Sequence, residues 1–185
     1  MNYLVIDLEA TCWERGSIPS RMETIEIGAV MLASAAGPPQ GEFNAFVRPV
    51  ASPALSDFCK ALTSIRQEDV DAANIFPIVL KSLVDWAQPA QPFVWCSWGA
   101  YDMKQLRSDC RRHGIAFPAS LERHVNLKRV FAKLTDGRPR TMKEALRWMS
   151  IPLDGRHHRG IDDARNIAKV ACWTLPRASN ELLGA

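Results

Sequence analysis

The first apolar run of the chain, at residues 3–9, reads Tyr-Leu-Val-Ile-Asp-Leu-Glu. Its length and its branched residues are typical of a buried β-strand. Because side chains alternate across a strand, Asp7 and Glu9 share one face while Ile6 and Leu8 point to the other. Two carboxylates at the end of an apolar strand repel each other, and a cation between them would relieve that repulsion. Solvated strand ends are the alternative explanation for this pair taken alone.

The segments that follow predict a mixed sheet with helices. Residues 25–32 and 43–50 predict two strands that short loops, including residues 37–41, join to the first in an antiparallel meander. Residues 93–97 predict a fourth, buried strand. Helical patterns occur at residues 55–62, 76–86 and 101–110, after a capping box formed by Thr141 and Glu144, and from near Asp162 to Leu175. This order predicts a single α/β domain over residues 1–185.

The composition excludes several classes of protein. Of 185 residues, 47% are hydrophobic and 23% charged, which is globular rather than disordered composition. An uninterrupted apolar stretch of the ~20 residues that a membrane span needs is absent, and the N-terminus lacks the basic region of a signal peptide. The five cysteines contain no C-x-x-C pair. These features predict a cytoplasmic protein without a disulfide framework.

Charge is divided unevenly along the chain. Residues 1–100 carry 6 Lys and Arg against 11 Asp and Glu, whereas residues 101–185 carry 17 against 9. A solvated, salt-bridged surface explains this distribution without further function. The alternative is a basic second half that attracts phosphates beside an acidic first half that holds cations.

Further acids stand where helices begin. Asp102 follows the fourth strand, and Asp162 and Asp163 open the last helix. A helix cap or a favourable helix dipole accounts for each acid singly. Together with Asp7 and Glu9, however, they form a set of carboxylates suited to two hard cations. Two such ions ~4 Å apart clamp the attacking and leaving oxygens of a phosphodiester during in-line displacement.

Two histidines, His157 and His158, precede these last acids in a glycine-containing loop. Adjacent histidines are most often surface residues. A neutral imidazole near a cation site can, however, accept the proton of an attacking water. Their position just before a candidate metal ligand favours the second explanation.

The order of these motifs resembles that of the DEDDh 3′-to-5′ exonucleases. The motifs are Asp7-Leu8-Glu9-Ala10-Thr11-Cys12-Trp13, residues 23–30, Ser97-Trp98 with Asp102, and His158 through Asp163. Residues 46–49 and 62–65 are similar to the branch that contains the histone-mRNA 3′-end exonuclease and bacterial relatives labelled sporulation-kinase pathway inhibitors. The resemblance spans roughly residues 3–173. It implies a ribonuclease H-like fold with a mixed five-stranded sheet and helices on both faces, which places a fifth strand near residues 123–127.

The resemblance also implies roles for individual residues. Asp7, Glu9, Asp102 and Asp163 would bind two Mg²⁺ ions, with Mn²⁺ as a substitute. His158, five positions before Asp163, would be the general base. His157 and Asp162 would lie nearby without these roles, and His157 is expected to point away from the site.

The predicted activity is removal of nucleoside 5′-monophosphates from single-stranded 3′ ends, with RNA favoured over DNA. Residues predicted to bind the terminal nucleotide are Ala10, Thr11, Cys12, Trp13, Phe58 and Trp98. Basic residues predicted to follow the phosphates are Lys128, Arg129, Lys133, Arg138, Arg140 and Lys143. Core packing is the alternative for the aromatic residues, and an ordinary charged surface is the alternative for the basic ones. A DNA-trimming or oligoribonuclease-like enzyme and a regulatory nucleic-acid-binding protein remain the alternative functions, and the sequence leaves the oligomeric state open.

Overall fold

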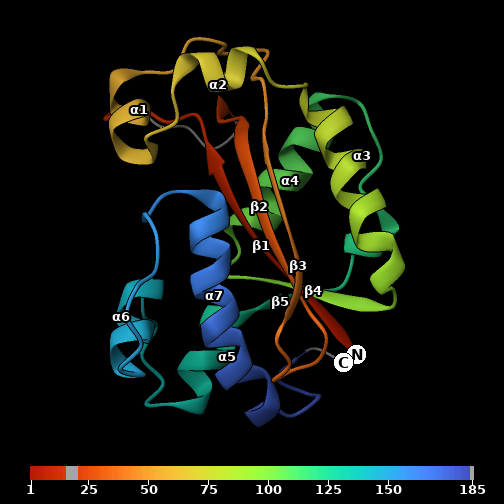
Figure 1. Ribbon diagram of the computed structural model, residues 1–185, viewed down its shortest axis with the longest axis vertical. Coiled ribbons are helices and arrows are strands. Elements are labelled where there is room, and N and C mark those ends of the chain that lie inside the picture. The colour runs from red at the N-terminus through yellow and green to blue at the C-terminus, as the bar shows by residue number, and fades with distance from the viewer. Residues whose placement is uncertain (16–20, 184–185) are drawn as a thin grey trace.

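The computed structural model describes residues 1–15 and 21–183 and has one five-stranded sheet at its centre (Figure 1). The strand order is β3-β2-β1-β4-β5. The strands are β1 Asn2–Ala10, β2 Thr24–Leu32, β3 Pro39–Phe46, β4 Phe93–Ser97 and β5 His124–Asn126. β1 pairs antiparallel with β2 and parallel with β4, so the sheet is mixed as predicted. The fifth strand lies within the stretch that the resemblance implied.

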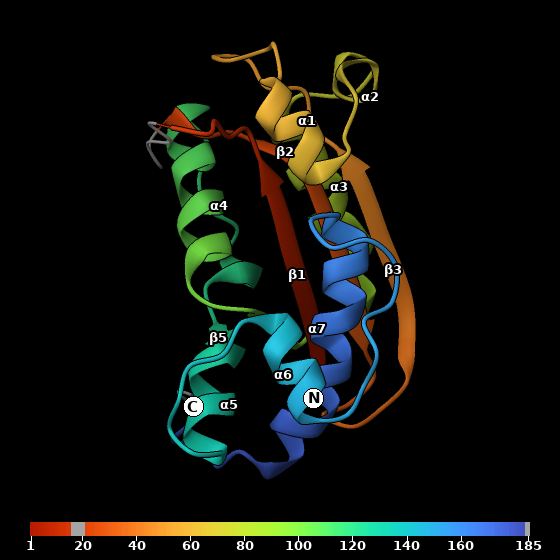
Figure 2. The ribbon, with the colours of Figure 1, turned by 90° about the vertical axis from the view of Figure 1, so that its left-hand side faces the viewer.

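Helices cover both faces of the sheet (Figures 1 and 2). In the described residues they are α1 Asp57–Thr63, α2 Gln67–Asp71, α3 Phe76–Ala87, α4 Tyr101–Arg112, α5 Leu127–Leu134, α6 Met142–Trp148 and α7 Gly160–Thr174. α3 and α4 pack on one face, and α5, α6 and α7 pack on the other. α1 and α2 lie at the end of the sheet to which β1 points. The short helix α2 was not predicted, whereas α6 begins at the predicted capping box of Thr141 and Glu144.

The alternation along β1 explains the two cores. Tyr3 and Val5 pack against α5, α6 and α7, while Leu4 and Ile6 pack against α3 and α4. Asp7 continues the face of Tyr3 and Val5. Its side chain therefore emerges beside α7, where the apolar packing of that face ends.

The third strand lies four residues earlier than predicted, because residues 37–41 are not all loop. The main-chain N–H of Gly37 donates to the Ser34 carbonyl at 3.2 Å, so the turn is tight and pairing resumes with Pro39 opposite Leu32. Proline is tolerated here because it is the first residue of a strand at the sheet edge. After Phe46 the chain leaves the ladder, and residues 47–50 are not part of the strand.

Two glycines allow α7 to approach the sheet beside Asp7. Gly28 of β2 pairs with Asp7 in the β-ladder. A Cβ atom added to Gly28 would lie 2.0 Å from the carbonyl carbon of Gly160, at the start of α7. A Cβ atom on Gly160 would in turn lie 3.0 Å from the Gly28 nitrogen and 3.3 Å from the Asp7 carbonyl oxygen. The first turn of α7 is thus seated directly on the strand pair that carries Asp7.

Gly28→Ala is expected to destabilise the protein strongly. The new methyl group meets backbone atoms, which cannot rotate away, so α7 must move off the sheet. Overpacking costs typically 1–3 kcal/mol and more where backbone must shift. For a chain of this size, a cost of about 3 kcal/mol lowers the melting temperature by about 6–12 °C. In the control Gly41→Ala, the added Cβ lies 3.5 Å from the Trp86 side chain, and the melting temperature should change by less than about 3 °C. Equal melting temperatures in thermal denaturation would contradict the close packing.

The helices also bear on membrane association. None of them, within residues 1–15 and 21–183, has both the length and the apolar character needed to cross a bilayer.

Candidate active site

Four carboxylates predicted from the sequence come together at the end of the sheet to which β1 points. Asp7 and Glu9 lie near the C-terminal end of strand β1. Asp102 lies in the first turn of α4, and Asp163 lies in the first turn of α7. We refer to these residues as the carboxylate cluster. Glu9 is 8% exposed and Asp102 and Asp163 are 4% exposed, while Asp7 is half-buried. The carboxylate oxygens of Asp7, Glu9 and Asp163 lie within 4.8 Å of one another.

Main-chain donors fix two members of the cluster. The Leu8 N–H donates to Oδ1 of Asp102 at 3.2 Å, which ties the start of α4 to β1. The His158 N–H donates to Oδ2 of Asp163 at 3.0 Å. Each bond orients one oxygen of a carboxylate.

The cluster is electrostatically unfavourable when its acids are ionised. Burial raises the pKa of Asp7 well above its usual value, and the neighbouring charges of Asp102, Glu9 and Asp163 raise it further. Burial, followed by the charges of Asp163 and Glu26, raises the pKa of Glu9 to about 9. Burial also raises the pKa of Asp102 to about 6, against hydrogen bonds that favour its charged form. A bound cation would reverse this penalty.

Other buried acids have hydrogen-bond or ion-pair partners within the protein, which sets them apart from Asp7 and Glu9 of the cluster. Glu23 accepts the N–H groups of residues 50–52 at 2.7–3.1 Å. Asp109 accepts from Thr24 and Gln105 and pairs with Arg112. For Asp7 and Glu9, by contrast, the neighbouring charges with the largest effect on the pKa are those of other carboxylates. Their all-oxygen donor set fits hard divalent cations.

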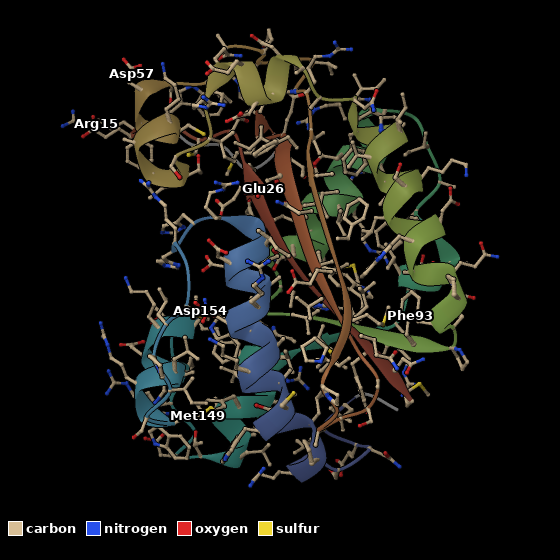
Figure 3. All side chains as sticks on the ribbon, viewed as in Figure 1. Arg15, Glu26, Asp57, Phe93, Met149 and Asp154 are labelled. Carbon is tan, nitrogen blue, oxygen red and sulfur yellow. The ribbon has the colours of Figure 1, made fainter. Side chains whose placement is uncertain are left out.

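Glu26 of β2, which Figure 3 labels near the start of α7, anchors the segment that carries the histidines. It is completely buried, and its carboxylate accepts from the Arg159 guanidinium at 3.1 and 3.2 Å and from the Gly160 N–H at 2.9 Å. The loop before α7 is therefore fixed to β2 directly beside the cluster. Sequence reasoning did not identify this residue, because its partners lie more than 130 positions away.

Both histidines face Asp163, and the expectation that His157 points away is wrong. Nδ1 of His157 lies 2.9 Å from Oδ2 of Asp163, and the two imidazole rings stack with centroids 3.9 Å apart. His158 adopts a left-handed backbone conformation with φ of 65°. This turn of the main chain reverses the loop and brings both rings to the same carboxylate. Burial, together with the nearby His157, lowers the pKa of His158.

Asp162 is held outside the cluster. Its Oδ2 accepts the Arg156 N–H at 2.9 Å, and its Oδ1 pairs with Arg165 at 3.0 Å. The two neighbouring aspartates at the start of α7 thus have different environments, and Asp163 is the one beside Asp7 and Glu9.

A cleft of about 370 Å³ opens over the carboxylate cluster. Its volume lies at the lower end of the range for small-molecule sites. Ala10, Cys12 and Trp98, three of the residues predicted to bind the terminal nucleotide, line it, and both histidines contribute to its wall. The indole N–H of Trp98 donates to the Arg140 carbonyl at 3.1 Å, which holds this ring in place.

Three predicted substrate contacts are not part of the cleft wall. The Thr11 side chain is buried, and its hydroxyl accepts the Glu23 N–H at 3.0 Å. Phe58 is exposed on α1, but Leu62, one turn further along, lines the cleft. Trp13 follows the end of β1 and also lies outside the lining. Contacts of these three residues with a bound nucleotide stay predictions.

Two further lining residues, of which only Tyr101 had no predicted role, are chemically suited to a nucleotide. The ring of Tyr101 is 41% exposed and lies at the cleft, adjacent in sequence to Asp102. Lys128, one of the predicted basic residues, also lines the cleft. Arg140 is instead paired with Asp136 at 2.7 Å. An aromatic residue directly before a candidate catalytic acid was the available signal for Tyr101.

Metal binding is expected to stabilise the protein in a pH-dependent way. Because the pKa values of Glu9 and Asp102 are raised, the folded metal-free protein binds more protons than the unfolded chain between about pH 4 and pH 9. Its stability should therefore fall as pH rises through that range. Mn²⁺ or Mg²⁺ should raise the melting temperature more at pH 8 than at pH 5. Asp7→Asn removes one of the mutually repelling charges, so it should raise the melting temperature of EDTA-treated protein by about 3 °C or more. Asp162→Asn is the control and should not raise it. A melting temperature unaffected by Mn²⁺ at pH 8 would contradict cation binding.

Comparison with known proteins places this geometry in a family. Residues 4–171 match the exonuclease family of the RNase T type. The chain is 32% identical to ERI1 exoribonuclease 2 of Mus musculus over 195 residues, covering 94% of this chain and 28% of that protein. It superposes on the nuclease domain of 3′hExo, a DEDDh family member bound to rAMP, with a TM-score of 0.87 and 31% identity, covering 95% and 92% of the two chains. A 3′-exonuclease structure described as recognising the histone mRNA stem-loop gives a TM-score of 0.88 at 30% identity, covering 95% and 81%.

These likenesses confirm the predicted resemblance in part. The ribonuclease H-like fold and the relation to the histone-mRNA 3′-end exonuclease are confirmed. The matches give no support to the bacterial half of the resemblance, the sporulation-kinase pathway inhibitors. The chain spans less than a third of the length of the mouse relative.

Proposed function

The chain belongs to the exonuclease family, and from that premise we propose that residues 1–185 form a single domain that removes nucleoside 5′-monophosphates from RNA 3′ ends. One observation carries the proposal. Four carboxylates and two imidazoles from β1, α4 and the α7 region converge in a single cleft. A protein that only binds nucleic acid gains nothing from acids at that point, because they repel phosphates.

The carboxylate cluster is proposed to hold two Mg²⁺ ions, with Mn²⁺ as a substitute. Asp7, Glu9 and Asp163 supply oxygens that already lie close together, and Asp102 is oriented towards β1 by the Leu8 N–H. When bound, such ions stabilise the charge that develops on the attacking and leaving oxygens of a phosphodiester.

His158 is proposed to act as the general base. Its ring lines the cleft beside Asp163, and its lowered pKa keeps the imidazole neutral at physiological pH. The main-chain N–H of His158 donates a hydrogen bond to Asp163, which fixes the main chain from which the ring extends.

The rest of the cleft is proposed to hold the terminal nucleotide. Trp98 and Tyr101 offer aromatic surfaces on which a base can stack, worth about 1–3 kcal/mol per base. Tyr101 is the better placed of the two, because Trp98 is half-buried and packs against Phe131 at 5.9 Å between ring centroids. Lys128 is placed to pair with a phosphate.

The preference for RNA follows the mouse relative, which is an exoribonuclease. Trimming of DNA is the second candidate, since the carboxylate cluster does not distinguish the two sugars. Cytoplasmic location also stays a prediction.

The direct test of the proposed function is a time course with purified protein, Mg²⁺ and 5′-labelled RNA and DNA of one sequence. Ladders shortened from the 3′ end on RNA, abolished by EDTA, would support the proposal, and cleavage in excess EDTA would contradict it.

The enzyme is expected to require a free 3′ hydroxyl. A 3′-phosphate adds negative charge beside Asp7 and Glu9 and enlarges the group that the cleft must accept. We expect 3′-phosphorylated RNA to be degraded at least about 10²-fold more slowly than the same RNA with a 3′ hydroxyl, an effect of about 2.7 kcal/mol. Treatment of the blocked RNA with a phosphatase should restore the rate. Rapid cutting of a circular RNA would show internal cleavage instead.

A further inference from the structure

Asp163 belongs to two sets of metal-ligand atoms with different chemistry. One set is the oxygens of Asp7, Glu9 and Asp163, and the other is His157, His158 and Asp163. In each set the donor atoms lie within 4.8 Å of one another. We call the second set the histidine site.

The donor atoms of the histidine site lie close together. Nδ1 of His157 is 2.9 and 3.1 Å from the two oxygens of Asp163. The rings stack face to face at an interplanar angle of 27°, so one ring must turn before both imidazoles can bind one ion. A tetrahedral ion with bonds of about 2.0–2.1 Å needs donor atoms about 3.4 Å apart, so side-chain rotation must bring the donor atoms, now within 4.8 Å of one another, closer together. The His157 side chain is 31% exposed, so an ion has access from solvent.

The donor types of the two sets select different ions. Carboxylate oxygens suit Mg²⁺ and Mn²⁺, whereas imidazole nitrogens suit Zn²⁺ and its neighbours Co²⁺ and Ni²⁺. Two histidines and one carboxylate, with a fourth position left open, is a ligand set found in zinc enzymes. Mg²⁺ gains little from imidazole, so the histidine site should reject it.

We propose that His157, His158 and Asp163 form a binding site for Zn²⁺ or a similar transition-metal ion, and that its occupation inhibits the enzyme. The inhibitory half rests on the proposed function. An ion bound there takes up the imidazole nitrogen of His158 that would accept a proton, and it draws an oxygen of Asp163 away from the carboxylate cluster. Mg²⁺ competes for Asp163 but not for the two imidazole nitrogens, so inhibition is expected to persist when Mg²⁺ is saturating.

The binding half is tested by calorimetric titration of EDTA-treated, dialysed protein with Zn²⁺. His157→Gln keeps a side-chain donor for Asp163 and removes the imidazole ligand. Because loss of an outer-shell partner alone costs 10–100-fold in affinity, loss of this ligand should weaken Zn²⁺ binding at least about 30-fold. Asp7→Asn, which alters only the all-oxygen set, should stay within about threefold of wild type. His157→Ala repeats the test should the glutamine substitute as a ligand, and melting temperatures check that each variant is folded.

The inhibitory half is tested with labelled RNA at saturating Mg²⁺ and increasing Zn²⁺. His157→Gln should need at least about tenfold more Zn²⁺ than wild type for half inhibition, each rate being taken relative to the same variant without Zn²⁺. Equal Zn²⁺ affinity in wild type and His157→Gln, with loss in Asp7→Asn, would overturn the site. Tight binding without inhibition of an active enzyme would overturn the regulatory role. An enzyme inactive on RNA would contradict the proposed function, while calorimetry would still decide the site.

Discussion

Asp7→Asn is expected to lower exonuclease activity at least about 10³-fold. Asp7 is the acid on which the charges of Asp102, Glu9 and Asp163 all act, so it stands at the electrostatic centre of the cluster. The substitution keeps the shape of the side chain and removes its charge. The charge stabilisation lost in the transition state amounts to several kcal/mol, and each 1.36 kcal/mol is a factor of ten in rate. Degradation of 5′-labelled RNA under saturating Mg²⁺ measures the effect.

Asp162→Asn is the matched control for this variant. It removes the acid next to Asp163 in α7, which pairs with Arg165 rather than facing the cluster. Its activity should remain within about tenfold of wild type, the scale of an exposed ion pair together with one hydrogen bond. Wild-type activity in Asp7→Asn, or a larger loss in Asp162→Asn, would mean that the cluster has been assigned to the wrong acids.

His158→Ala is expected to lower turnover by about 10²–10⁴-fold, the usual contribution of general-base assistance. The variant should still show the rise in melting temperature with Mn²⁺, because the carboxylate cluster is intact. His157→Ala should lose about tenfold, since it deletes a hydrogen bond to Asp163 worth about 1.5 kcal/mol rather than the base itself. Single-turnover assays on one RNA compare the two. A greater loss in His157→Ala would transfer the role of base to His157.

The pH profile gives an independent check on His158. A base must be neutral, and burial together with His157 lowers the pKa of His158 below its usual 6.5. Activity should therefore persist below pH 6.5 on acidification and fall only as pH drops through the lowered pKa. A decline that begins well above pH 6.5 would point to a different titrating group.

The sequence alone determined the elements whose cause is local. Alternation along residues 3–9 places Asp7 and Glu9 on one face, and the structure has them beside α7. The capping box of Thr141 and Glu144 specifies its own helix start, because both partners lie within one turn. The position of the third strand was predicted less well, because it depends on how tightly residues 34–37 turn.

Which acids are structural and which face the cleft was decided only by the tertiary structure. Glu23, Glu26 and Asp109 are at least as buried as Glu9. Unlike Glu9, they accept hydrogen bonds from donors in distant segments. Those donors are 27 to 134 residues away for Glu23 and Glu26, beyond any local pattern.

The orientation of His157 has a cause of the same kind. Spacing distinguished His158 from His157, but the left-handed turn at His158 and the anchoring of Arg159 by Glu26 bring both rings to Asp163. The approach of α7 to β2 likewise depends on Gly28 and Gly160, which are neighbours only in the fold. Local periodicity thus specified the elements and the residue types of the site, whereas long-range contacts decided which side chains meet in it.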